Sequence, residues 1–254
     1  MFRLVDTHAH LEDLEDLEGA IRRAVDAGVV AIVTVGSDYD SSRFALEISG
    51  KEDHGLRIYP ALGIHPWSLN QSKTESTLSF IESRVDGAVG IGEVGLDYWY
   101  RDVRKDSEKK KLQQSIFNAL LKIAKQHDKP AIIHSRGAWN DCLDITIEVG
   151  VEKAVFHWFT GPIEVLEKLL GQGYFISATP AAEYSKEHRS VIENVPLENM
   201  LLETDSPVNY RGLEAEPVHV IKSLSAVAEL KKIAENVVAD KTTENASRIF
   251  GIRI

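Results

Sequence analysis

Cysteine is almost absent from this chain, because its 254 residues include only Cys142. A single cysteine rules out an internal disulfide and is typical of proteins in a reducing compartment, so we expect a cytoplasmic protein. Long apolar runs are missing as well. The longest, around residues 29–35, falls far short of the ~20 residues that a membrane-spanning helix needs, so we expect no membrane partner.

Positive charge is also scarce. The chain has 29 lysines and arginines against 39 aspartates and glutamates, which gives a formal net charge of −10. Proteins that bind nucleic acid across a broad basic face depend on many contacts between cations and phosphates, and this composition argues against that class. It leaves room for phosphate chemistry at a metal, because a bound metal brings its own positive charge.

The sequence does contain a regular succession of short apolar runs rich in β-branched residues. Eight such runs begin about 28 residues apart on average. Short apolar runs without alternation are typical of strands that are buried on both faces. We therefore predict strands over residues 2–5, 29–36, 57–64, 88–93, 130–134, 154–157, 174–178 and 200–203.

Amphipathic segments separate these strands. One is predicted to be a helix that ends at Gly28, and another a longer helix that Ser107 caps. Alternating strands and helices over the whole length predict an α/β fold, a (β/α)8 barrel formed by residues 1–254 as one domain. The rival fold, a doubly wound open sheet, usually has a glycine-rich loop after its first strand. Residues 6–10 instead read Asp-Thr-His-Ala-His, which favours the barrel.

Histidines gather where the predicted strands end. Five of the nine lie at or just past a strand end, and two acidic residues occupy equivalent positions. Because the carboxyl ends of barrel strands meet at one mouth, we expect these side chains to form one metal-binding cluster. Its members are His8, His10, His65, Glu93, His134, His157 and Asp205. The other histidines, at positions 54, 127, 188 and 219, are interpreted as surface residues.

Each member of the cluster also has a structural interpretation. His8 and His10 are a metal clamp if the strand continues through them, and otherwise a pair in a surface loop. Glu93 is either a ligand or half of a buried ion pair, and Asp205 either a catalytic carboxylate or the cap of a turn. The convergence of all seven at one barrel end favours the metal site.

These residues lie in motifs that resemble the TatD family of metal-dependent deoxyribonucleases, which are barrels related to the amidohydrolases. The matching segments are Asp-Thr-His-Ala-His-Leu at 6–11, Gly-Ile-His-Pro at 63–66, Gly-Glu-Val-Gly-Leu-Asp-Tyr at 92–98, Ile-His-Ser-Arg at 133–136, His-Trp-Phe-Thr-Gly at 157–161 and Glu-Thr-Asp-Ser-Pro at 203–207. The set occurs in order along nearly the whole chain. The chain departs from the family at Ala215 and Gly137, near the expected substrate rim.

The resemblance implies two divalent metal ions per chain. It assigns one to His8, His10, Glu93 and Asp205, and the other to Glu93, His134 and His157, so that Glu93 bridges the pair. Such ligands suit Zn, Mn, Fe or Ni, and Mg is a further possibility for the native ion. Two ions of this kind activate a water for attack, with Glu93 and Asp205 as the catalytic residues and Asp205 as the base.

The resemblance further implies a 3′–5′ exonuclease that cleaves phosphodiester bonds of DNA at single-stranded ends. His65, Arg136 and Tyr98 are the predicted substrate-binding residues, Arg136 through a forked contact with phosphate and Tyr98 through stacking. Residues 101–111, with six positive and three negative side chains, are a candidate guide for DNA or simply the solvated start of a helix. Another ester or amide bond, such as that of a D-aminoacyl-tRNA, is the alternative substrate. A barrel kept only as a binding scaffold is disfavoured, because no ligand is lost.

Overall fold

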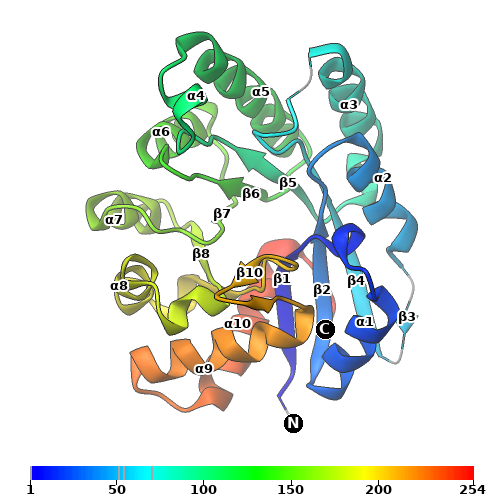
Figure 1. The fold of residues 1–254 in the computed structure, drawn as a ribbon, viewed down its shortest axis with the longest axis vertical. Coiled ribbons are helices and arrows are strands. Elements are labelled where there is room, and N and C mark those ends of the chain that lie inside the picture. The colour runs from blue at the N-terminus through cyan, green and yellow to red at the C-terminus, as the bar shows by residue number, and fades with distance from the viewer. Residues whose placement is uncertain (1, 51, 54, 70) are drawn as a thin grey trace.

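A computed structural model describes residues 2–50, 52–53, 55–69 and 71–254. Eight parallel strands follow one another around a ring in chain order, with helices on its outside, which confirms the predicted (β/α)8 barrel (Figure 1). The ring strands are β1 (Leu4–Ala9), β2 (Val29–Val35), β4 (Leu56–Leu62), β5 (Gly90–Gly95), β6 (Ala131–His134), β7 (Ala154–Phe156), β8 (Phe175–Ala178) and β9 (Met200–Leu202). Three short strands lie off the ring: β3 (Glu52–Asp53) pairs with β4, and β10 (Asn209–Tyr210) pairs with β11 (Leu213–Glu214).

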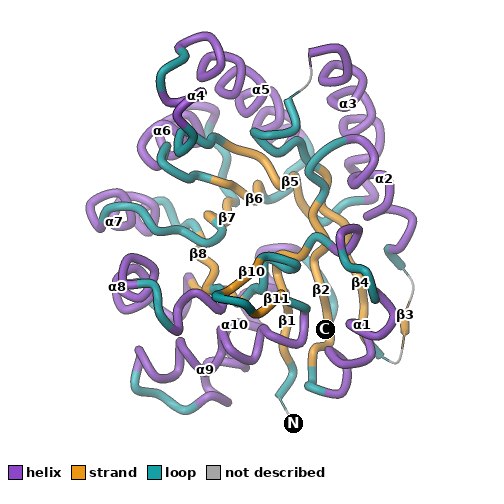
Figure 2. Tube along the Cα trace, viewed as in Figure 1, coloured by secondary structure: helices purple, strands orange, loops and turns teal. Residues whose placement is uncertain are grey.

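The helices form the outer layer (Figure 2). They are α1 (Leu17–Asp26), α2 (Tyr39–Ile48), α3 (Gln71–Arg84), α4 (Arg101–Arg104), α5 (Ser107–Gln126), α6 (Trp139–Val149), α7 (Ile163–Gly171), α8 (Lys186–Asn194), α9 (Val220–Lys231) and α10 (Glu235–Phe250). Within the described ranges, no helix combines the length and the apolar character needed to cross a membrane.

Most predicted element ends differ from the observed ones by no more than two residues. Two more specific predictions were wrong. The cap of α5 is Asp106, whose carboxylate accepts hydrogen bonds from the backbone N–H groups of Glu108 and Lys109, whereas Ser107 is already helical. The first strand extends well beyond the predicted residues 2–5, through Asp6 and Thr7 to Ala9. These polar residues continue the strand because the last strand of the barrel satisfies them.

Closure of the barrel joins the first strand of the ring to the end of the last one. The Asp6 carboxylate accepts hydrogen bonds from the backbone N–H and the hydroxyl of Thr204, at 2.9 and 2.5 Å. Thr7 donates its hydroxyl to the Leu202 carbonyl, 2.9 Å away. Burial raises the pKa of Asp6 to about 8, although the hydrogen bonds from Thr204 oppose the shift. The strand ends that carry the candidate ligands are thereby held together.

Alternate residues of the strands enter two separate apolar clusters. Ile132, Val155 and Leu201 belong to a small cluster, while their chain neighbours pack with helix residues in a larger one. Because side chains alternate across a strand, the small cluster fills the barrel interior. His134 and His157 lie two residues beyond Ile132 and Val155, so the same alternation carries them above the interior cluster.

Candidate metal centre

Glu93, near the end of β5, is the centre of the site. The two oxygens of its carboxylate contact two different pairs of histidines. Oε2 lies 3.5 Å from His8 Nε2 and 3.3 Å from His10 Nε2. Oε1 lies 2.9 Å from His134 Nδ1 and 2.8 Å from His157 Nε2. One buried carboxylate thus contacts both halves of the cluster.

Glycines allow the neighbouring strands to approach Glu93 this closely. A Cβ at Gly63 would collide with the Glu93 backbone. A Cβ at Gly95 would collide with the His134 carbonyl, and the φ of +145° at Gly95 is one that other residues rarely adopt. Gly63 therefore allows the chain after β4 to approach β5, and Gly95 allows β5 to approach β6, which carries His134.

Asp205 completes the half of the site formed by the first and last strands. Its Oδ1 lies 3.5 Å from His8 Nε2 and 3.6 Å from His10 Nε2. Its backbone N–H donates to the His8 carbonyl at 2.9 Å, so barrel closure places the carboxylate directly against this histidine.

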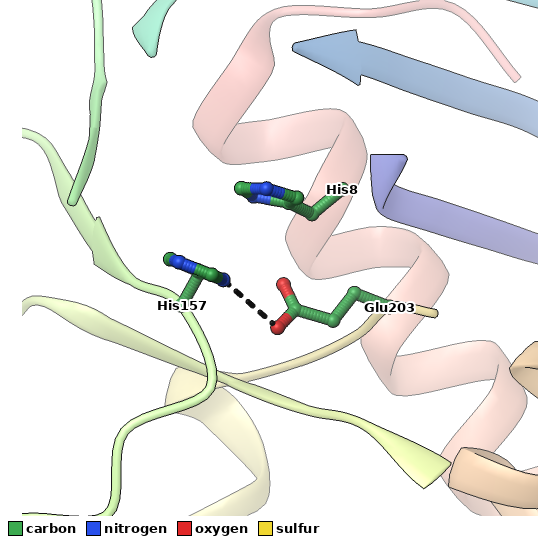
Figure 3. Close-up of side chains that lie close together, drawn as sticks. All are labelled: His8, His157 and Glu203. Carbon is green, nitrogen blue, oxygen red and sulfur yellow. Dashed lines mark ion pairs between the residues drawn. The ribbon is translucent and has the colours of Figure 1, made fainter. Parts of the chain in front are cut away.

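Carboxylates beside the outer nitrogens orient two of the histidines. His134 Nε2 lies 3.0 Å from Asp97 Oδ2, which leaves Nδ1 to face Glu93. His157 Nδ1 lies 3.4 Å from Glu203 Oε1 (Figure 3). Its Nε2 therefore faces Glu93. A carboxylate behind a histidine fixes the tautomer and turns the lone pair of the other nitrogen inward, as in metal centres generally.

His65 has the opposite orientation. Its Nδ1 accepts a hydrogen bond from the Trp67 backbone N–H at 3.1 Å, so the proton of the neutral ring is on Nε2. That nitrogen lies 3.5 Å from Glu93 Oε1. Burial lowers the pKa of His65 to about 3, which keeps the ring neutral. His65 therefore presents an N–H donor to the site, whereas a metal ligand needs a lone pair.

Charge in the cluster is strongly coupled. Burial opposes ionisation of Glu93, but the surrounding histidines outweigh it and hold its pKa well below the usual range. Burial likewise opposes protonation of His10 and His157, but neighbouring carboxylates raise the pKa of both rings well above normal. Asp205 differs, because desolvation dominates and raises its pKa. The carboxylates of this centre need positive charge beside them.

The residues fit a divalent metal. His8 is fully buried, and neither of its ring nitrogens has a hydrogen-bond partner among the described residues. Its ring stacks on that of His157 with centroids 4.1 Å apart (Figure 3). Its Nε2 lies 3.5 Å from both Glu93 Oε2 and Asp205 Oδ1. A buried imidazole without a hydrogen bond is costly, and a cation held with the two carboxylates would satisfy it. Imidazole and carboxylate donors suit a transition metal.

Several groups of side chains at this mouth lie close enough together to bind a metal ion. Potential ligand atoms lie within 4.8 Å of one another in three sets: His8, His10 and Glu93; His65, Glu93 and His134; His8, His157 and Glu203. The second set includes His65, but the proton on its Nε2 argues against ligation.

The seven residues predicted to form the cluster do converge. The two remaining predicted substrate residues lie beside it. Arg136 contacts Asp97 Oδ2 through both Nε and Nη2, each at 3.0 Å. Tyr98 is 8% exposed, accepts a hydrogen bond from Gln114 and lies under Lys110. The roles of Arg136 and Tyr98 toward substrate stay predictions.

The surface interpretation of His188 was wrong. His188 is completely buried, where it accepts a hydrogen bond from the Thr179 N–H and donates one to the Phe159 carbonyl. These partners come from other loops, so its own helix gave no sign of them. His54, interpreted in the same way, lies outside the described residues.

Sequence reasoning missed Asp97 and Glu203, the carboxylates that orient the histidines. Both are completely buried. An acid at the end of an apolar strand was the sign that identified Glu93, and Glu203 offers the same sign. Asp97 follows its strand by two residues, and only the fold shows what it contacts.

Known proteins resemble this chain over nearly its whole length. The family model described as TatD related DNase matches residues 5–251. The metal-dependent hydrolase YabD of Bacillus subtilis is 35% identical, with 98% of this chain and 99% of YabD covered. Human deoxyribonuclease TATDN3 is 31% identical, with 97% of this chain and 94% of the relative covered. The crystal structure of YjjV, a TatD homologue from Escherichia coli, superposes with a TM-score of 0.87 at 26% identity and 99% coverage of both chains. The chain therefore belongs to the TatD family of metal-dependent hydrolases.

Proposed function

We propose that this hydrolase is a deoxyribonuclease that works with two divalent metal ions. The observation that carries the proposal is the division of the Glu93 carboxylate, with Oε2 toward His8 and His10 and Oε1 toward His134 and His157. A carboxylate that serves two ions needs one oxygen for each. His8, His10, Glu93 and Asp205 would hold one ion, and Glu93, His134 and His157 the other.

Ions bound there would supply Lewis-acid stabilisation of the charge that develops on a phosphate during displacement. The chain supplies the proton transfers and the orientation. Asp205 accepts a proton from the attacking water, since its carboxylate lies beside His8 and His10 at the centre. One P–O bond forms to the water oxygen while the bond to the leaving sugar oxygen breaks, and that oxygen takes up a proton from solvent.

His65 and Arg136 hold the substrate in this scheme. His65 Nε2–H donates to a phosphate oxygen, which the hydrogen bond from Trp67 to the other ring nitrogen permits. Arg136 adds positive charge at the rim next to Asp97. DNA as the substrate is supported by the family model, described as TatD related DNase, and by the similarity to human deoxyribonuclease TATDN3. The lone buried Cys142 supports a place in the reducing cytoplasm.

The test combines metal analysis with a panel of substrates. We expect two ions per chain, and we expect His134→Ala to lose one of them. Single-stranded and duplex oligonucleotides labelled at either end would be compared with neutral esters and amides, with each metal added singly. Shortening of oligonucleotides from the 3′ end supports the proposal. Turnover of esters or amides alone would favour the alternative, a hydrolase for another bond on the same site.

A further inference from the structure

Two large aromatic side chains are left open to solvent beside the metal centre. Trp67 follows β4 and is 55% exposed, and Tyr100 precedes α4 and is 47% exposed. Isolated exposed aromatics are common on protein surfaces and need no explanation. These two contact each other, with ring centroids 5.4 Å apart and ring planes at 69°.

A cation completes the group. The guanidinium carbon of Arg136 lies 5.0 Å from the centroid of the Trp67 ring and 4.9 Å from that of Tyr100. Both distances are within the range of cation–π attraction. We call Trp67, Tyr100 and Arg136 the aromatic rim.

The aromatic rim is held in place by a buried acid. Asp97 Oδ2 accepts hydrogen bonds from Trp67 Nε1 at 2.9 Å and from Arg136 Nε at 3.0 Å. Asp97 is itself completely buried. The same oxygen lies 3.0 Å from His134 Nε2. Side chains fixed in this way lose little conformational entropy when a ligand binds, which is the physical basis of preorganisation.

The aromatic rim also lies at the right distance from the reaction. The Trp67 ring is 4.7 Å from the His65 ring and 6.2 Å from the His134 ring, centroid to centroid. A nucleobase is joined to its own phosphate through a single sugar, so a base against Trp67 places that phosphate within reach of Glu93 and its histidines.

We infer that the aromatic rim stacks an unpaired nucleobase next to the scissile phosphate. This inference rests on the proposed function and narrows it to single-stranded ends. A base inside a duplex has both faces covered by its neighbours, whereas an unpaired base offers a free face to an aromatic ring or a guanidinium. A net charge of −10 argues against a broad basic face for the backbone, so stacking would supply affinity where phosphate contacts are few.

The test uses ligands that contain no phosphodiester bond to cut. Calorimetry on metal-loaded protein would compare deoxyadenosine monophosphate with 2-deoxyribose 5-phosphate, which has the same phosphate but no base. We expect the base to strengthen binding about 5- to 100-fold in the unaltered protein, the range of base–aromatic stacking. The ratio of the two affinities should fall close to one in Trp67→Ala and fall by a smaller factor in Tyr100→Ala.

Trp99→Ala is the matched control. Trp99 is next to Tyr100 in the chain and 62% exposed, and no ring or cation contact of its side chain is found within the described ranges. This variant should keep the ratio of the unaltered protein. Trp67→Phe keeps an aromatic ring but loses the hydrogen bond to Asp97. It should keep a large part of the affinity ratio between the two ligands. A reduced ratio in Trp67→Ala alone would then come from the missing ring and not from misfolding.

Equal ratios in Trp67→Ala and in the unaltered protein would overturn the inference, even if the enzyme cleaves DNA. A ratio near one in the unaltered protein would overturn it too. A high ratio that Trp67→Ala abolishes would support it even if DNA proves not to be the substrate. A cleavage assay gives a second test. The preference for single-stranded over duplex oligonucleotides should shrink in Trp67→Ala and remain in Trp99→Ala.

Discussion

On each of two sides of the barrel mouth, a buried carboxylate contacts one histidine of the centre and one tryptophan. On the side of β5 and β6, Asp97 orients His134 and holds the indole of Trp67. On the side of β7 and β9, Glu203 orients His157 and accepts a hydrogen bond from the Trp158 backbone N–H at 3.0 Å. Each buried carboxylate therefore links one histidine of the centre to one tryptophan.

The difference lies in what covers the tryptophan. Trp67 is more than half exposed, whereas the partly buried Trp158 packs on Tyr210, whose ring centroid is 5.4 Å away and which is itself buried. Tyr210 belongs to the β10–β11 hairpin. We therefore expect the β5–β6 side, the open side, to receive substrate and the β7–β9 side, the covered side, to support the centre from behind. The predictions below test this division.

The largest effect is expected at Asp205, which enters the centre from the covered side. Asp205→Asn keeps the size of the side chain and one carbonyl oxygen but cannot take a proton. Turnover should fall by about 10²- to 10⁴-fold or more, the usual contribution of general-base catalysis, while the fold and some metal binding remain. Kinetics and elemental analysis of the same preparation would check this.

His65→Ala serves as the comparison for Asp205→Asn. It should weaken phosphate binding and keep both ions. Near-normal turnover of Asp205→Asn on every substrate, with two ions bound, would mean that Asp205 is not the base.

The two orienting carboxylates provide the most direct comparison of the sides. Asp97→Asn and Glu203→Gln should each weaken metal binding about 10- to 100-fold, the typical effect of losing such a partner. Only Asp97→Asn should also reduce the preference for deoxyadenosine monophosphate over 2-deoxyribose 5-phosphate. Competitive metal titration and calorimetry measure the two effects separately. A reduced preference in Glu203→Gln would break the division between an open and a covered side.

The covered side is also expected to be sensitive to acid. His188 is held neutral there, because burial lowers its pKa to about 4 and the Thr179 N–H occupies its Nε2. Since the unfolded chain takes up this proton near pH 6.5, the contribution of His188 to stability is complete above pH 6.5. It is lost as pH falls toward 4 and amounts to roughly 3 kcal/mol.

Denaturant unfolding of metal-free protein between pH 4 and 7 would measure this effect. His188→Gln cannot be protonated, so its free energy of unfolding should fall less steeply over the same interval. Parallel curves for the two proteins would show that His188 does not contribute.

The smallest effect concerns salt. If binding relies on the centre and the aromatic rim, few phosphates are neutralised by lysine or arginine. Each contact on a single strand contributes a slope of about −0.7 in log affinity against log salt, so two to four contacts give roughly −1.4 to −2.8. A slope steeper than about −6 for single-stranded DNA would point to a basic groove, with residues 101–111 as its first candidate.

The sequence predicts the fold and the centre well where one rule is enough. The carboxyl ends of parallel strands meet at one mouth, so His134 and His157 are placed correctly without knowledge of their neighbours. Partners that come from other strands are harder to predict. The role of Asp97 follows from its contacts with His134 and Trp67, which lie at or beyond the ends of other strands. The burial of His188 depends on two loops distant from its own helix. The first strand is longer than its apolar run because Thr204 satisfies Asp6.

Barrel closure also has a consequence for synthesis of the chain. His8 and Asp205 meet only when the first and last strands are paired, and α10 fastens that seam through Thr243 to the Arg3 carbonyl and through Asn245 to the Met200 carbonyl. A chain still on the ribosome has the ligands of β1 and β5 long before it has the carboxylate of Asp205. We therefore expect the centre to be complete only after α10 has been made, so that a product truncated before α10 should carry no activity.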